Sequence, residues 1–310
     1  PILLDQYLSN AIEIDVDALC DSSGSVVIAG LMEHVEPAGI HSGDSACCLP
    51  PISLSQGILD TVKEWTKLIA NKLNVVGLIN LQFAVKNVNS AENELFILEA
   101  NPRASRTVPF VSKAIGKPVA KLATQLMQGS SLEDINFTKE IIPKYQSVKE
   151  AVLPFKRFPG SDTLLGPEMR STGEVMGLAE DFGLAYAKSE LAAGNGVPSE
   201  GVAFLSTNDL DKEKLEDIAR ELLVLGFKLI ATKGTARYLL NLDIQVDEVL
   251  KVHEGRPNIE DLIRSGLIQL VINTPVGSQA FHDDAYLRSC LLYTSPSPRD
   301  ATLSRMPSSA

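Results

Sequence analysis

The segment FILEANPRASRTVPF, residues 96–110, places two oxygen-bearing side chains beside two guanidinium groups. Glu99 and Asn101 are two positions apart. In a β-strand, where side chains alternate between faces, such residues share a face about 7 Å apart. Arg103 and Arg106 follow directly. Carboxylate and amide oxygens suit a hard divalent cation, and guanidinium groups suit phosphate oxygens. The order therefore predicts a site for a metal-bound nucleotide.

A third oxygen ligand comes from the preceding apolar segment. GLINLQFAVK (77–86) and LFILEAN (95–101) are separated by a polar loop and are typical of two strands that pair antiparallel. A register that sets Gln82 beside Glu99 would bring Gln82, Glu99 and Asn101 together. Three hard oxygen ligands indicate Mg²⁺ or Mn²⁺.

The second of these strands sets the geometry of the arginines. Its alternation predicts that Leu95 and Ile97 share a face with Glu99. Pro102 cannot continue a hydrogen-bonded ladder, so both arginines would leave on a turn beside the metal. A solvated strand end in which Glu99 pairs with Arg103 is the alternative, and these residues alone do not decide between the two.

The elements upstream predict an α+β first half. Residues 12–21 alternate apolar and acidic side chains, 22–24 form a turn, and 25–35 return as the second strand of a hairpin. Ser53 and Gln56 predict a capping-box start for a helix. Its apolar stripe at helical spacing is Ile58, Val62, Trp65, Ile69 and Leu73.

From about residue 201 the pattern changes to short apolar strands alternating with capped helices, which predicts a parallel, doubly wound sheet. The small and polar residues 188–200 suit a domain boundary. In IATKGTARYL a strand ends at Thr232 and a helix starts at Thr235, an arrangement that attracts phosphate. Lys251 and Asn273 follow other strands at the same predicted edge.

Composition limits the partners. The chain has 310 residues with 45% hydrophobic content, enough for two cores. A formal net charge of -11 opposes both phosphate-rich polymers and anionic bilayers. We therefore expect neither nucleic acid nor a membrane as a partner. The four cysteines form no CxxC pair, which argues against a zinc site or a disulfide framework and fits a reducing compartment.

Five motifs resemble one known family. They are MEHVEPAGIHSGDSACCLP (32–50), NLQFAVK (80–86), EANPRASRTVPFVSKA (99–114), SVKEAVLPFKRFPG (147–160) and LGPEMRSTGEVMG (165–177). Together they are similar to the carboxyl half of the large chain of carbamoyl phosphate synthetases. The resemblance runs from residue 1 to about residue 290.

The resemblance implies three regions. Residues 1–190 would be a partial ATP-grasp domain, an α+β antiparallel sheet with helices that phosphorylates carbamate. Residues 191–290 would be an incomplete methylglyoxal-synthase-like allosteric domain with an α/β doubly wound parallel sheet. Residues 291–310 are rich in Ser, Pro and Arg, and we expect them to be disordered or non-native. Because Pro1 opens the chain without Met and the resemblance breaks off near Cys290, we expect truncation at both ends.

The resemblance also assigns the nucleotide site. It implies that Gln82, Glu99 and Asn101 hold the metal ions, and that Arg103 and Arg106 are catalytic and contact transferring phosphoryl or product oxygens. The remaining nucleotide contacts would be Leu8, Glu13, Gly39, Ile40, His41 and Ser42, with His41 and Ser42 contacting the nucleotide or K⁺. Without the family, a solvated strand position for Glu13 and an ordinary loop histidine for His41 are the alternatives.

Two effector sites are implied as well. The phosphate pocket for a nucleotide effector would consist of Lys212, Thr232, Thr235, Lys251 and Asn273. An ornithine pocket, as in bacterial relatives, would lie near Glu36, Asp44 and Glu150. Each of these residues taken alone is more often a helix cap, a surface lysine or a solvated acid. Pro275 stands where some relatives carry a hydroxyl group.

The implied function is that of an ATP-dependent ligase, a glutamine-hydrolysing carbamoyl phosphate synthase serving arginine and pyrimidine biosynthesis. Its cofactors would be ATP, Mg²⁺ or Mn²⁺, and K⁺. Its partner would be a small glutamine amidotransferase chain, in a homo-oligomer of heterodimers, in a bacterial cytoplasm or a plastid stroma. Because the glycine-rich lobe of the family should precede Pro1, we expect the isolated chain to be inactive. A regulatory nucleotide-binding fragment and another ATP-grasp ligase are the alternatives.

Overall fold

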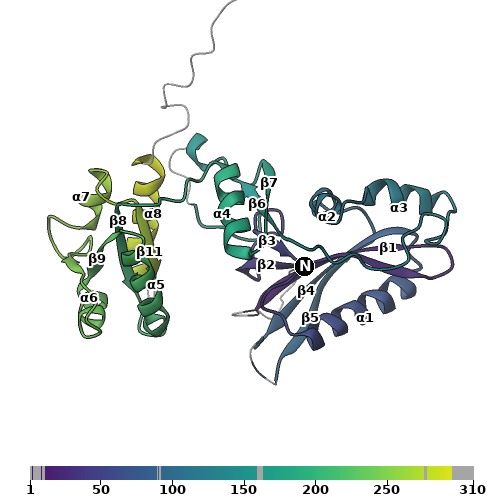
Figure 1. Cartoon of the computed structure of the whole chain (residues 1–310), viewed down its shortest axis with the longest axis horizontal. Helices are drawn as coiled ribbons and strands as arrows, with labels where there is room; N and C mark the ends of the chain where they lie inside the picture. The colour runs from purple at the N-terminus through teal and green to yellow at the C-terminus, as the bar shows by residue number, and fades with distance from the viewer. Residues whose placement is uncertain are drawn as a thin grey trace, which may run out of the picture. The chain divides into compact units, whose positions relative to one another are not determined.

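The computed structural model describes residues 11–88, 92–158, 163–275 and 278–294, together with Ile2, Leu8 and Ser90. The chain divides into two compact units, which we describe separately (Figure 1). Unit 1 comprises Pro1–Leu153 and Leu165–Asn195, and unit 2 comprises Pro154–Leu164 and Gly196–Ala310. Among the described residues, none of the helices combines the length and the apolar character that crossing a bilayer requires.

Two expected boundaries differ from these bounds. Residue 190 lies inside helix α4 (Phe182–Ala193), whose Ala185 packs in a core cluster with strand residues of unit 1. Of the expected tail, residues 291–294 are the last turn of helix α8 (Ser278–Thr294). The rest of that tail lies outside the described residues.

Unit 1 is built on a seven-stranded sheet in the order β5-β4-β1-β2-β3-β6-β7. Every neighbouring pair in it is antiparallel. The strands are β1 (Ile12–Cys20), β2 (Val26–Pro37), β3 (Cys47–Leu49), β4 (Gly77–Lys86), β5 (Glu94–Asn101), β6 (Gln146–Val152) and β7 (Gly173–Ala179). The predicted hairpin and the predicted pairing of the two metal-ligand strands are confirmed.

Helices cover both faces of this sheet (Figure 1). Helix α1 (Gln56–Lys72) packs on one face, against even-numbered β1 residues such as Val16. Helices α2 (Val108–Ile115) and α3 (Val119–Met127) pack on the other, against Leu19. Because side chains alternate along β1, Asp15 and Asp17 point to the same face as α2.

The predicted start of α1 is wrong by two residues. Ser55 is the N-cap, and its side chain accepts from the backbone N–H of Ile58. Ser53 is not available as a cap because its backbone N–H and its hydroxyl both donate to the carboxylate of Glu33. Of the predicted apolar stripe, Leu73 is 52% exposed, since it follows the last helical turn.

A β-bulge corrects the predicted faces of β5. Phe83 pairs with Ile97 and Gln82 pairs with Glu99, so Leu98 is an extra residue in the ladder. The insertion reverses the alternation. Leu95 therefore packs with the α1-side core, whereas Glu99 faces the opposite side.

Unit 2 is the predicted parallel sheet, with four strands in the order β10-β9-β8-β11. The strands are β8 (Val202–Thr207), β9 (Lys228–Thr232), β10 (Asp247–Val249) and β11 (Leu270–Thr274). Helices α5 (Lys212–Val224) and α6 (Lys233–Leu240) pack on one face. Helices α7 (Ile259–Arg264) and α8 pack on the other, so the sheet is doubly wound. A 3₁₀ turn, Phe155–Arg157, also belongs to this unit.

Candidate nucleotide and metal site

Unit 1 contains a cleft of about 530 Å³ on the face of the sheet that carries α2. Its walls come from β1, β4, β5, the loop after β2, the β5–α2 loop and the segment 165–169. Of the predicted catalytic, nucleotide and metal residues, the cleft is lined by Glu13, Gly39, Ile40, His41, Ser42, Gln82, Glu99, Asn101, Arg103 and Arg106. Leu8 is half-buried and is not part of this lining.

The three predicted metal ligands are adjacent on the ladder. Gln82 is the direct partner of Glu99, and Asn80 is the direct partner of Asn101. Glu99 and Asn101 both face the cleft because the register, corrected by the bulge, puts them there. Hard oxygen donors with a single carboxylate fit Mg²⁺ or Mn²⁺, which keep coordination positions for water and phosphate. Among the described residues, no alternative cluster of three His, Cys, Asp or Glu side chains is arranged to hold a metal.

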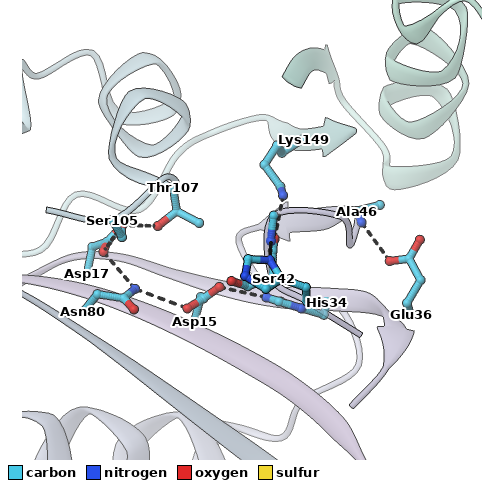
Figure 2. Close-up of polar contacts among 12 residues, drawn as sticks. Asp15, Asp17, His34, Glu36, Ser42, Ala46, Asn80, Ser105, Thr107 and Lys149 are labelled. Atoms are coloured by element: carbon cyan, nitrogen blue, oxygen red, sulfur yellow. Dashed lines mark hydrogen bonds and ion pairs between the residues drawn. The ribbon is translucent and has the colours of Figure 1, made fainter. Parts of the chain in front are cut away.

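The floor of the cleft is a buried polar network that we did not predict (Figure 2). Asn80 Nδ2 donates to Asp15 Oδ1 at 3.2 Å and to Asp17 Oδ1 at 3.1 Å. Asp15 Oδ2 lies 2.9 Å from His34 Nε2. The alternation of Glu13, Asp15 and Asp17 was the only sequence signal for it.

Burial overturns the solvated alternative for this strand face. Glu13, Asp15 and Asp17 are 5%, 1% and 0% exposed. Three acids in one dry sheet face require donors from other strands, because burying an unpaired carboxylate is costly. Those donors come from β2, β4 and the β5–α2 loop, the loop that also carries Arg103 and Arg106.

Burial acts to raise the pKa of all three carboxyls, but the pKa of Asp15 is lowered by its partners. Burial raises the pKa of Asp17 to about 6. The charge of Asp15 also acts to raise this pKa, whereas the hydrogen bonds from Thr107 and Ser105 act to lower it. Burial also acts to raise the pKa of Asp15, but the hydrogen bond and charge of His34 outweigh it and the pKa is lowered. The pKa of Glu13 is raised, chiefly by burial.

The loop 39–42 forms the opposite wall. The backbone N–H of His41 donates to the Gly166 carbonyl at 2.9 Å, and the Lys149 ammonium donates to the Ser42 carbonyl at 3.0 Å. Lys149 is 1% exposed, so a buried cation holds the backbone of this loop (Figure 2). Gly39 has φ +106°, a conformation that favours glycine and lets the backbone approach a ligand closely.

The residues expected near an ornithine pocket lie outside this cleft. Asp44 accepts from the backbone N–H groups of Arg170 and Ser171 at 2.7 and 2.8 Å, so it joins two loops. Glu36 accepts from the Ala46 N–H at 2.7 Å. Burial and the like charges of Glu190 and Glu36 raise the pKa of Glu150 to about 7.

Unit 2 has a small cavity of about 40 Å³ at the carboxyl edge of its sheet. It brings together three of the five predicted effector residues, Thr232, Lys251 and Asn273. The other two do not line it. Lys212 pairs with Asp209 at the start of α5, and the buried Thr235 hydroxyl accepts from the Thr207 N–H at 3.2 Å.

Comparisons with known proteins match both units. The family model "Carbamoyl-phosphate synthase L chain, ATP binding domain" matches residues 1–135, and the model "MGS-like domain" matches residues 214–293. The carbamoyl phosphate synthase large chain of Nostoc sp. is 57% identical over 288 residues, covering 93% of this chain and 26% of that protein.

A plant protein is similar to nearly the same degree. The carbamoyl phosphate synthase arginine-specific large chain, chloroplastic, of Arabidopsis thaliana is 56% identical over 277 residues, covering 89% of this chain and 23% of that protein. The chain thus spans about a quarter of the length of the relatives it matches. Among solved structures, a biotin carboxylase–ATP complex from Campylobacter jejuni aligns with a TM-score of 0.47 and 17% identity, over 61% of this chain and 46% of that one.

Proposed function

We propose that unit 1 forms the carbamate-phosphorylating site of a large chain. The premise is that this chain contains a carbamoyl-phosphate synthase L chain ATP binding domain and an MGS-like domain. In this reaction a carbamate oxygen attacks the γ-phosphorus of ATP, the bond to the β-phosphate oxygen breaks, and carbamoyl phosphate and ADP form. The nucleophile belongs to the substrate, so the protein supplies positioning and charge neutralisation.

The residues of the cleft divide this work. A divalent cation at Gln82, Glu99 and Asn101 would neutralise and align the nucleotide phosphates. Arg103 and Arg106 would bind the oxygens of the transferring phosphoryl group or of the product. Glu13 would accept hydrogen bonds from ribose hydroxyls, and Leu8 would contact adenine. The loop 39–42 would contact the nucleotide or K⁺ through His41 and Ser42.

The observation that supports this proposal best is the convergence of three oxygen ligands and two arginines on one cleft. Glu99 is the only carboxylate among the three ligands. We expect Glu99→Gln, made in a full-length large chain, to reduce carbamoyl phosphate formation by about 100-fold or more, because an amide holds a divalent cation far less tightly.

The assay is carbamoyl phosphate formed from ATP, bicarbonate and ammonia. Glu94→Gln is the matched control, since Glu94 starts the same strand with an exposed side chain that does not line the cleft. Full activity of the Glu99→Gln enzyme would remove Glu99 from the metal site and with it the proposed mechanism.

A regulatory role for unit 2 is supported by the meeting of Thr232, Lys251 and Asn273 at the carboxyl edge of its parallel sheet. Lys251 and Asn273 there would bind the phosphate of a nucleotide effector. We propose further that ornithine binds near Glu36 and Glu150, and that ammonia comes from glutamine through a small amidotransferase chain in an oligomer of heterodimers. The second candidate function is that of a regulatory fragment that binds nucleotide effectors without catalysis of its own.

A further inference from the structure

The loop between β5 and α2 carries both arginines. Residues 102–107 join β5 to α2, and the side chains of Arg103 and Arg106 are exposed. The Arg103 guanidinium donates to the neighbouring Ala104 carbonyl at 3.0 Å, which does not connect the loop to the sheet. What holds the arginines in place must therefore come from the residues beside them.

The residues on both sides of Arg106 are bound to one carboxylate. Ser105 Oγ donates to Asp17 Oδ1 at 2.7 Å, and Thr107 Oγ1 donates to Asp17 Oδ2 at 2.6 Å. Asn80 Nδ2 donates to the same Oδ1 from β4. Asp17 lies on β1, an interior strand of the sheet, and is fully buried, so the loop is tied to the interior of unit 1 (Figure 2).

This contact costs stability at both of its ends. Thr107 occupies the N-cap position of α2, yet its side chain makes no capping hydrogen bond there. A helix that forgoes such a cap is less stable than one that has it. A carboxylate buried among neutral donors also loses hydration. Two departures from local stability rules at a single contact are typical of functional positions.

We propose that Asp17 is a positioning residue for phosphoryl transfer, holding Arg103 and Arg106 over the metal site through Ser105 and Thr107. This inference rests on the proposed function. Asp17 does not reach the reacting atoms. Its effect is to fix where two positive charges meet the developing negative charge, and displacements of about 1 Å at such groups can cost about 100-fold in rate.

The test uses a full-length large chain with three variants. Asp17→Asn keeps the size of the side chain and replaces charge-assisted hydrogen bonds by weaker neutral ones. Thr107→Val removes the hydroxyl with little change in volume, and Thr107→Ser restores it. Asp21→Asn is the matched control, because Asp21 directly follows β1, is buried as Asp17 is, and accepts from Ser23, Ser25 and Leu132 without contacting the loop.

Two readouts separate the tether from the proposed function. The first is the kcat and the KM for ATP in carbamoyl phosphate synthesis. We expect Asp17→Asn and Thr107→Val to lower kcat by about tenfold or more with little change in KM, since Glu13 and the metal ligands remain. Thr107→Ser should recover most of that kcat.

The second readout needs no activity. Trypsin cleaves after Arg103 and Arg106, so the rate at which peptides ending there appear measures how often the loop detaches. Loss of one hydrogen bond should raise that rate about tenfold in Asp17→Asn and Thr107→Val, but not in Asp21→Asn.

Unchanged cleavage in both Asp17→Asn and Thr107→Val would overturn the tether, whatever the activity. Equal acceleration in Asp21→Asn would also overturn it, because the effect would then be general loosening. If Asp17→Asn and Thr107→Val are cleaved faster but the wild-type large chain forms no carbamoyl phosphate, the tether stands and the proposed function is rejected instead.

Discussion

Asp17 is buried among hydroxyl and amide donors, and its pKa therefore differs between the folded and the unfolded chain. Its pKa is raised from 3.8 to about 6, first by burial. Between these values the folded chain binds a proton at Asp17 and the unfolded chain does not. This contribution to stability is therefore complete below the unfolded pKa and is lost as pH rises through the folded pKa.

Replacing Asp17 by Asn removes this titration. In the native chain the contribution of Asp17 to the free energy of unfolding falls by about 3 kcal/mol between pH 4 and pH 7, because the pKa of Asp17 is shifted by about two units. We expect the stability of Asp17→Asn, relative to the native chain, to improve by up to that amount over the same range. Urea unfolding at both pH values measures it.

The single tryptophan of the chain, Trp65, makes this measurement specific. It lies on α1 against the core of unit 1, so its fluorescence follows that unit alone. A difference between native and variant chains that is the same at pH 4 and pH 7 would show that Asp17 titrates at its ordinary pKa in the folded state. The variant would then gain nothing from neutrality.

At the scale of the elements, strand pairing was predictable and its irregularity was not. Period-2 alternation and a short polar loop are enough to predict that β4 and β5 pair antiparallel. The register with Gln82 beside Glu99 was a condition of the metal site, which the structure meets. The bulge at Leu98 inserts one residue, which leaves no periodic trace in the sequence. The acidic face of β1 was misjudged for a related reason, because the donors that allow its burial, such as Ser105, are distant in sequence.

Two glycines fix how closely helices approach the sheet. A Cβ on Gly30 of β2 would lie 2.7 Å from a methyl group of Val111 on α2. We expect Gly30→Ala to destabilise unit 1 by about 1–3 kcal/mol, because overpacking displaces the helix that follows the arginine loop. Val111→Ala in the same chain should restore most of this loss.

Gly177 of β7 is the comparison for Gly30. A Cβ there would lie 1.9 Å from the backbone carbonyl of Ala185 on α4. No side-chain truncation can relieve a clash with backbone, so Gly177→Ala should cost more and resist rescue. Urea midpoints followed by Trp65 fluorescence measure both. If Val111→Ala fails to rescue Gly30→Ala, then the contact with α2 is not what limits that position.

For the whole molecule, the sequence predicted two units with different sheets, and the structure confirms them. Alternating strands and helices after residue 201 are sufficient to predict a parallel sheet, and open parallel sheets bind ligands at their carboxyl edge. Which side chains meet at that edge was only partly predictable. The helix predicted to start at Thr235 starts at Lys233, so Thr235 lies inside its first turn, and its hydroxyl bonds to the backbone of Thr207 instead of facing the cavity.

Lys251 is the one lysine that lines the cavity of unit 2. A nucleotide phosphate bound there would lose a charge-assisted hydrogen bond in Lys251→Ala, and this should weaken binding about 10- to 100-fold. Calorimetric titration of the chain with UMP and IMP measures the change. Thr232 and Asn273 would remain to contact the phosphate, so weak residual heat is consistent with the prediction.

The matched control is Lys228→Ala, which removes a lysine from the same unit and changes the net charge equally. Lys228 is exposed and begins β9, whereas Thr232 of the cavity ends it, so the two lie at opposite edges of the sheet. If binding depends on the local contact, only Lys251→Ala weakens it. If both variants weaken it alike, the chain attracts nucleotides through its overall field, and the cavity of unit 2 is not their site.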